Sequence, residues 1–207
     1  MKSSLNRSTL RRGLVSLTLL VAAGVAHAGI IFQDNFNGEN GGVGKTNYAG
    51  FANWTVDNGS VDLIGNGFFD FLPGNGLYVD MDGSTGNAGR MLSSSPINVV
   101  AGSTYTLSYQ LAGNRRNSAN ESVSILVNFG SLLNQTVSLT QSAPFTTFTH
   151  TFTATASGPL SLSFEGSGGD NIGMLLDNVK LEVPEPGSLA LVGLGLAGAA
   201  AIRRRRR

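Results

Sequence analysis

Several runs in the middle of the chain alternate apolar and polar residues with a period of two. At 104–111, tyrosine or leucine stands at every second position, with threonine, serine or glutamine between them. Similar alternation occurs at 123–129, 148–152 and 160–164. Side chains two residues apart lie on one face of a β-strand, so each run predicts a strand with one buried face. These faces need a common core.

The segments between these runs have the composition of turns, and no stretch of the middle region has a convincing helical period. The spacing predicts about eight to ten short strands in two packed sheets. We therefore expect an all-β, antiparallel β-sandwich of the jelly-roll type. The turn segments are rich in Gly, Asn, Ser and Asp, and they lie at 37–50, 65–76, 83–89, 113–120 and 166–173.

Residues 1–28 have the composition of a secretory signal peptide. A basic segment is followed by the apolar run 14–25 and then by an Ala-His-Ala triplet. We expect cleavage directly after the triplet, before Gly29. A permanent membrane helix is the alternative, although the run is short for one. The pair Arg11 and Arg12 leaves twin-arginine export open beside the general secretory route.

The C-terminal segment 183–207 has three parts in a fixed order. The Pro-Glu-Pro triplet at 184–186 cannot continue a strand or helix, so it predicts an extended, accessible peptide. The apolar, glycine-rich stretch 187–202 would span about 24 Å as a transmembrane helix, against a hydrocarbon core of ~30 Å. Basic residues are expected to stop translocation and stay in the cytoplasm; they are Arg203, Arg204, Arg205, Arg206 and Arg207.

This tail closely resembles the PEP-CTERM sorting signal. The resemblance implies that exosortase, a membrane protease-transpeptidase, recognises Pro184, Glu185 and Pro186 and removes the helix. It also implies transient anchoring in the inner membrane, and association with the envelope and exopolysaccharide of a biofilm-forming, Gram-negative-type bacterium. An uncleaved tail anchor is the alternative. Both interpretations place the middle domain, 29–182, outside the cytoplasm.

The formal net charge of +1 comes from the two ends of the chain. Between Gly29 and Glu182 there are five basic and twelve acidic residues, a net charge of about −7. Such a domain lacks the basic surface that binds nucleic acid, so we expect no nucleic-acid partner. The absence of cysteine excludes disulfides, thiolate metal sites and cysteine nucleophiles.

The middle domain carries a second resemblance, to the galactose-binding-like carbohydrate-binding modules and their plant cell-wall members of unassigned activity. The segment 32–39 and the tryptophan-bearing segment 51–56 are similar to the first two strands of those modules. The resemblance implies a non-catalytic sandwich that associates with carbohydrate. Further similar segments lie at 77–83, 101–109, 112–114 and 175–179.

A calcium site is implied by this resemblance. Asp177 shares strand parity with Leu175 and Val179, so it would aim a carboxylate into the apolar face, where an unpaired charge is costly. In the resembling modules an acidic residue on the last strand often joins a structural calcium ion near the first strand. The alternative is that Asp177 accepts hydrogen bonds from a turn or lies at a bulge. The implied ligands are Asp34, Asn37, Glu39 and Asp177.

A second oxygen-rich loop contains Asp80, Asp82 and Asn87, and a later loop contains Arg115 and Arg116. The carboxylates could accept hydrogen bonds from sugar hydroxyls, and an arginine could bind the carboxylate of a uronic acid. We take Asp80, Asp82, Asn87 and Arg115 as candidate ligand-binding residues. The alternatives are ordinary turns and a solvated arginine pair.

Aromatic residues offer candidates for sugar stacking. Trp54 shares parity with Ala52 and Val56, which favours a place in the core over a stacking platform. The sequence does not distinguish among the other candidates, which are Tyr48, Tyr78, Phe68 and Phe69.

The sequence contains no recognisable catalytic motif. His150 is the one histidine left after signal removal, and it lies in phase with Phe148 and Phe152, as a strand histidine does. No GxSxG motif occurs, and no spacing selects a pair of catalytic carboxylates. We therefore expect an exported, non-enzymatic domain that associates with exopolysaccharide. The alternatives are a structural biofilm protein that binds other proteins, and a glycosidase or lyase.

Overall fold

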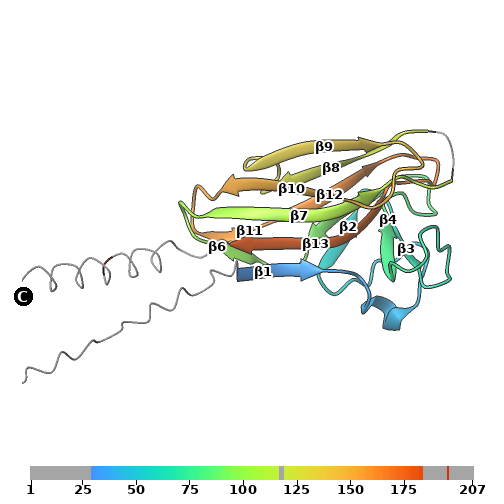
Figure 1. Ribbon diagram of the computed structural model, residues 1–207, viewed down its shortest axis with the longest axis horizontal. Coiled ribbons are helices and arrows are strands. Elements are labelled where there is room, and N and C mark those ends of the chain that lie inside the picture. The colour runs from blue at the N-terminus through green and yellow to red at the C-terminus, as the bar shows by residue number, and fades with distance from the viewer. Residues whose placement is uncertain (1–28, 117–118, 184–194, 196–207) are drawn as a thin grey trace, which may run out of the picture. The chain divides into compact units, whose positions relative to one another are not determined.

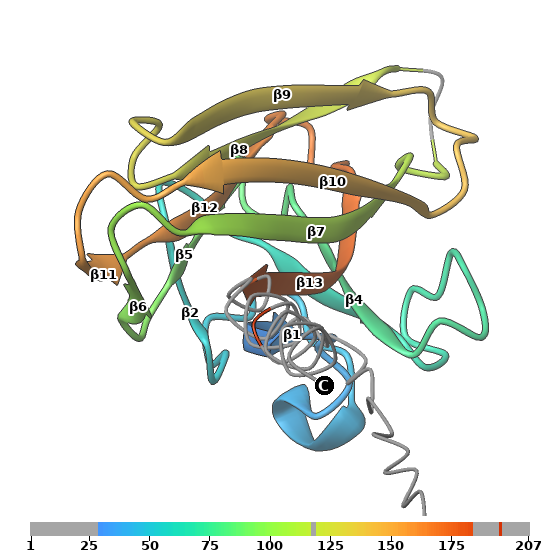
Figure 2. The same ribbon diagram turned by 60° about the vertical axis from the view of Figure 1, so that its left-hand side comes forward.

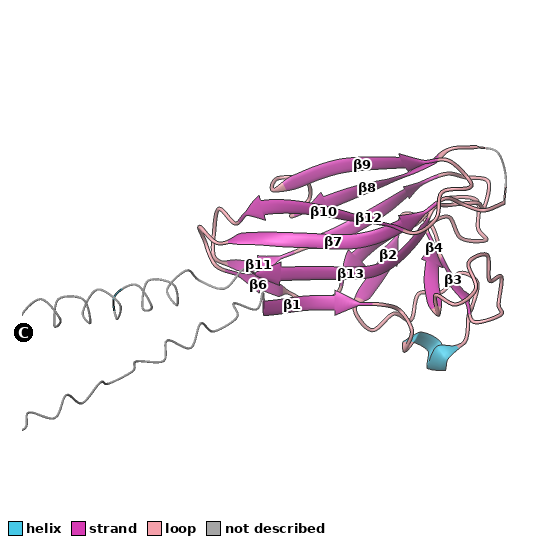
Figure 3. Ribbon diagram, in the orientation of Figure 1, coloured by secondary structure: helices cyan, strands magenta, loops and turns pink. Residues whose placement is uncertain are grey.

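The computed structural model describes residues 29–116, 119–183 and 195. The predicted signal peptide, the Pro-Glu-Pro triplet, the apolar tail and the arginine cluster all lie outside the described residues. Within the described part of the chain, no helix is long and apolar enough to cross a membrane. The described residues between 29 and 183 form thirteen strands and one short 3-10 helix (Figures 1 and 3).

The strands form two antiparallel sheets that pack face to face, as Figure 2 shows. A small pair, β6 (Ile97–Val99) with β11 (Gly158–Leu160), closes one end, and the 3-10 helix η1 covers Glu39–Gly42. The first sheet has the order β10 (Thr146–Thr153), β7 (Thr104–Ala112), β13 (Leu175–Val183), β4 (Leu77–Asp80) and β3 (Asp62–Gly65), with β1 (Gly29–Asp34) also paired to β13. The second has the order β2 (Trp54–Asp57), β5 (Arg90–Ser93), β12 (Leu162–Ser167), β8 (Glu121–Val127) and β9 (Leu133–Leu139).

The period-two patterns define the core. Every second residue of β7 from Tyr105 to Leu111 is buried, and β8 buries Val123, Ile125 and Val127 in the same way. Removing these side chains from water is the main stabilising term of such a sandwich, at about 25 cal/mol per Å². The predicted all-β antiparallel sandwich is confirmed.

Two of the expected strands differ in detail. The alternation at 123–129 predicted an inward-facing Phe129, but β8 ends at Val127 and Phe129 is exposed in the β8–β9 turn. The run at 160–164 is divided, because Leu160 belongs to β11 and Leu162 to β12 in another sheet. More strands form than expected because those of three or four residues, such as β6 and β11, are too short to produce a period.

A glycine next to β4 allows the segment after β1 to pack closely against that strand. Gly76 has a positive φ of +76°, and a Cβ at this position would lie 1.9 Å from Asn37 Oδ1. That oxygen accepts a hydrogen bond from Leu77 N at 2.7 Å. Only glycine lets the backbone come close enough for this bond.

Candidate functional site

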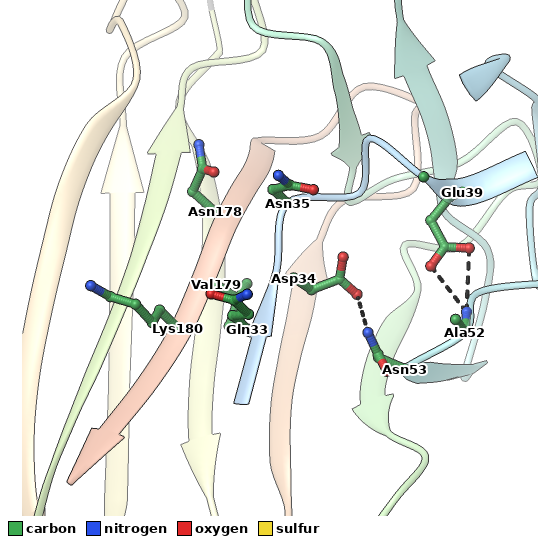
Figure 4. A pocket seen from close by; sticks show the side chains of 10 residues that line it. Gln33, Asp34, Asn35, Glu39, Ala52, Asn53, Asn178, Val179 and Lys180 are labelled. Carbon is green, nitrogen blue, oxygen red and sulfur yellow. Dashed lines mark hydrogen bonds between the residues drawn. The ribbon is translucent and has the colours of Figure 1, made fainter. Parts of the chain in front are cut away.

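A polar cleft of about 620 Å³ lies where β1 ends, beside β13 and the start of β2 (Figure 4). Its side chains are mostly amides and carboxylates, together with one lysine. No aromatic side chain is among the described residues that line the cleft. The lining residues are Gln33, Asp34, Asn35, Gly38, Glu39, Ala52, Asn53, Asn178, Val179 and Lys180.

Asp34 ties the end of β1 to the start of β2. Its Oδ2 accepts hydrogen bonds from Trp54 Nε1 at 2.9 Å and from Asn53 Nδ2 at 3.1 Å, and its Oδ1 accepts one from Phe36 N at 2.9 Å. The side chain is buried, so these donors compensate for its lost hydration. Asp34 therefore holds one wall of the cleft in place.

Glu39 ties the 3-10 helix η1 to the segment before β2. Its two carboxylate oxygens lie 3.0 and 3.3 Å from Ala52 N, which donates to them (Figure 4). Tyr48 donates its hydroxyl to Gly50 O at 2.9 Å and lies 3.4 Å from Glu39 Oε2. Burial and the neighbouring Glu39 carboxylate raise the pKa of Tyr48. Both cleft carboxylates are thus engaged with N–H groups of the protein itself.

Asp177, which precedes the lining residue Asn178, is buried, as its strand parity predicted. It lies at an irregularity in the pairing of β13 with β7, and both of its oxygens accept hydrogen bonds from Asn178, at 2.7 Å from N and 3.1 Å from Nδ2. Burial raises the pKa of Asp177 to about 7, and the charge of Asp34 adds to this effect. Of the two interpretations of Asp177, the geometry favours a hydrogen-bonded bulge.

The four implied calcium ligands are not brought together as one set. Asp34 and Glu39 line the cleft and Asp177 lies near Asp34, but Asn37 turns its amide to Leu77. Among the described residues, no group of three or more His, Cys, Asp or Glu is placed to hold a metal ion. Calcium at these residues stays a prediction that the present geometry does not support.

Asp80 and Asp82, at the end of β4, are both buried. Asp80 Oδ1 accepts hydrogen bonds from Asp82 N at 3.1 Å and Gly173 N at 2.9 Å, and its Oδ2 pairs with Arg116. Asp82 Oδ2 accepts one from Gly169 N at 2.7 Å, whereas its Oδ1 has no hydrogen-bond partner. These two carboxylates hold the loop 166–173 against β4.

The other two candidates lie apart from this pair. Asn87 is exposed, and its backbone oxygen accepts a hydrogen bond from Ser60 N at 3.1 Å. Arg115 donates to Ser142 O at 2.5 Å. The arginine that reaches Asp80 is instead Arg116, which also lies 5.1 Å from the ring centroid of Phe71.

The buried carboxylates predict an unusual dependence of stability on pH. Burial raises the pKa of Asp80 to about 8, against the opposing charge of Arg116, and that of Asp177 to about 7. The folded state therefore keeps protons that the unfolded chain loses near pH 4, so the free energy of unfolding is expected to fall as pH rises from about 4 to 8. Asp177 alone contributes about 4 kcal/mol to this fall.

Urea unfolding across this pH range measures the effect. The matched variant Asp177→Asn keeps the shape of the side chain but cannot titrate, so it should show a shallower fall. An identical pH slope in both proteins would contradict the assignment.

Among the aromatic candidates, Trp54, Tyr78 and Tyr48 are buried, Phe68 is half-buried, and Phe69 is exposed. Trp54 packs edge-on against Phe32 and Phe164, with ring centroids 5.3 and 5.8 Å away. His150 lies in β10, where its Nε2 is 2.8 Å from the Tyr109 hydroxyl.

Sequence reasoning missed most of the cleft. Polar residues at exposed strand positions look like any solvated face, so no signal separated them from other amides. Their meeting depends on the pairing of β1 with β13, which sets Gln33 opposite Lys180. The missed residues are Gln33, Asn35, Asn53, Asn178 and Lys180.

Comparison with known proteins identifies the domain and the tail. Residues 35–182 match the family described as "Protein of unknown function (DUF642)". The chain belongs to this DUF642 family. Residues 182–206, which follow the DUF642 domain, match the PEP-CTERM protein-sorting motif, so this is an exported protein of the exosortase-sorted class. No curated protein matches the chain.

Solved structures give the fold of the DUF642 domain. The CBM22-1 xylan-binding domain from Paenibacillus barcinonensis Xyn10C has a TM-score of 0.50 at 14% identity, covering 78% of this chain and 99% of its own. The N-terminal cellulose-binding domain of Cellulomonas fimi β-1,4-glucanase C has a TM-score of 0.44 at 22% identity, covering 65% and 90%. The first match confirms the resemblance to β-sandwich carbohydrate-binding modules.

Proposed function

We propose that the DUF642 domain is a non-catalytic module that binds neutral or weakly charged polysaccharide through the cleft at the end of β1. The observation that carries this proposal is the lining of the cleft, where four amide side chains and Lys180 surround a space of about 620 Å³. An amide offers both donors and an acceptor, as sugar hydroxyls require. The likeness to carbohydrate-binding modules supports the same function.

The carboxylates of the cleft support binding rather than hydrolysis. A glycosidase needs one carboxylic acid to protonate the leaving oxygen and a second carboxylate as base or nucleophile. Asp34 and Glu39 instead accept hydrogen bonds from Trp54, Asn53 and Ala52, which hold the walls of the cleft. Both carboxylates therefore stabilise the local fold through these hydrogen bonds.

The tail supports a place outside the cytoplasm. In the proposed sequence of events, residues 1–28 direct export, the stretch 187–202 holds the precursor in the inner membrane, and Arg203–Arg207 remain on the cytoplasmic side. Exosortase then recognises Pro184–Pro186 and releases the domain from its anchor. The domain would reach the envelope or the surrounding exopolysaccharide in this way.

Calorimetric titration of the mature protein with soluble polysaccharides tests the binding function. Asn35→Ala and Lys180→Ala each remove one cleft hydrogen bond of about 1 kcal/mol, so each is expected to weaken binding by about fivefold. Asn98→Ala is the matched control, because Asn98 is an exposed amide on β6, away from the cleft lining. The titration is run with calcium and with a chelator, which also tests the predicted calcium site.

Saturable binding that the cleft variants weaken and the control leaves unchanged would support the proposal. Silence with every polysaccharide would favour the structural alternative, in which the domain binds other proteins. Release of oligosaccharides during the titration would establish a hydrolase or lyase and refute the proposal.

A further inference from the structure

The end of the sandwich where β1 begins and β13 finishes differs from the rest of the surface. Gly29 pairs with Val183 there, and the turn-containing segments 94–103 (with β6), 128–132 and 154–161 (with β11) lie on the same side of the domain (Figure 1). Backbone bonds link these turns, from Gly102 N to Ala154 O and from Asn128 N to Ser161 O. Figures 1 and 2 show the ends of β6, β8 and β11 on this side. We call it the terminal end.

Exposed apolar side chains gather at the terminal end. Within the described residues, six large hydrophobic side chains are exposed, and four of them lie here. The two most exposed stand at the tips of turns. The four are Ile30 at 52% exposure, Ile31 at 38%, Val100 at 61% and Phe129 at 69%. The remaining two, Val43 and Phe69, lie in the segments that follow η1 and β3.

The turns at the terminal end contain no charged residues. None of the turns 94–103, 128–132 and 154–161 contains an acidic or basic residue, although the domain carries a net charge of about −7. Two ionic groups of β13 lie beside these turns: Glu182, which stands opposite Ile30, and Lys180, with which it pairs at 3.1 Å. An uncharged surface with apolar tips loses little hydration when it meets lipid.

The position of Phe129 adds a local observation. Asn128, Phe129 and Gly130 have consecutive positive φ angles of 50°, 54° and 88°. Glycine and asparagine adopt this backbone readily, whereas a bulky side chain is strained in it. The turn therefore presents an aromatic ring to solvent at a position where glycine would be easier to accommodate.

We propose that the terminal end lies on the membrane interface in the anchored precursor, with Phe129 and Val100 inserted among the lipids. This rests on the proposed function, in which the apolar stretch beginning at Gly187 spans the inner membrane. Three residues lie between Val183 and Gly187, so four Cα–Cα steps give a reach of at most about 14 Å, and the terminal end stays close to the bilayer. The occupant is a lipid interface that needs no anionic headgroup, since the turns have no basic residue.

Such a contact presents the Pro-Glu-Pro triplet at the height of the membrane surface, where a membrane protease can reach it. It does not hold the domain after cleavage, because even a full myristoyl chain gives only marginal membrane binding. Two side-chain tips are weaker still. The contact positions the substrate and releases it once the tail is removed.

Site-specific fluorescence in proteoliposomes tests the proposal. The chain has no cysteine, so single cysteines can be placed at will in the full-length precursor. Phe129→Cys and Val100→Cys carry an environment-sensitive dye at the terminal end, and Val43→Cys and Phe69→Cys are matched controls of similar exposure elsewhere. Vesicles of phosphatidylcholine contain a nitroxide-labelled lipid as quencher.

The expected result is quenching and a blue shift at 129 and 100, water-like emission at 43 and 69, and no gain when anionic lipid is added. Flotation of the vesicles reports anchoring independently. A precursor that floats with all four dyes in water would overturn the lipid contact while leaving the anchor intact. A precursor that does not float would overturn both. A blue shift without quenching would indicate a second copy of the chain, and would also overturn the proposal.

Discussion

Replacement of Glu185 by alanine is expected to abolish removal of the C-terminal segment. The match to the sorting motif covers this residue, and Glu185 is the one charged member of the Pro-Glu-Pro triplet. A protease that recognises the triplet would have no charged side chain of the triplet to bind in the variant. Mass spectrometry of the envelope fraction should then detect peptides containing Arg203–Arg207, which the wild-type mature protein should lack.

Glu182→Ala provides the matched control for this experiment. The motif match begins at Glu182, but this glutamate lies in β13, where it pairs with Lys180, and it stands outside the triplet. Its replacement should leave processing unchanged. Retention of the arginine cluster in mature wild-type protein would mean that the tail is a permanent anchor, contrary to the proposed sorting.

Replacement of Trp54 by alanine is expected to lower the free energy of unfolding by about 4 kcal/mol. The indole is almost fully buried, contacts Phe32 and Phe164, and donates its Nε1 hydrogen to Asp34. The substitution leaves a cavity in the core and removes one donor from a buried carboxylate. Because Trp54 is the single tryptophan, unfolding in urea should be followed by circular dichroism rather than fluorescence.

Trp54→Phe separates the two contributions. It keeps most of the aromatic volume and removes the Nε1 donor, so it should cost about 1–3 kcal/mol. A Trp54→Ala protein with wild-type stability and lost polysaccharide binding would contradict a core role. It would indicate a stacking platform instead.

The strands with long periods could be predicted because burial acts on every second residue. The alternation at 104–111 corresponds to β7, with its apolar side chains buried in the sandwich. The pattern failed at Phe129, because the chain turns after Val127 and period alone does not mark where pairing ends. Strand parity predicted that Asp177 is buried. It did not predict the hydrogen bond from the adjacent Asn178, because that bond depends on a local irregularity in the pairing of β13 with β7.

The candidate site depended on long-range pairing. The sequence predicted Asp34 and Glu39 as calcium ligands. In the structure, each carboxylate accepts hydrogen bonds from N–H groups of the segment 52–54, and these bonds hold the lining of the cleft in place. The amides that line the cleft come from β1, from the β1–η1 segment, from the residue before β2, and from β13. Single-residue patterns carry no record of which strands become neighbours.

The sequence by itself determined the address and the fold class of this protein, because targeting segments act as linear peptides and strand burial repeats at a fixed local period. Tertiary structure alone decided which polar residues share the cleft, which arginine reaches Asp80, and which apolar side chains gather beside Gly29 and Val183. Those arrangements arise from the order of strands in the two sheets, where residues far apart in the chain become neighbours.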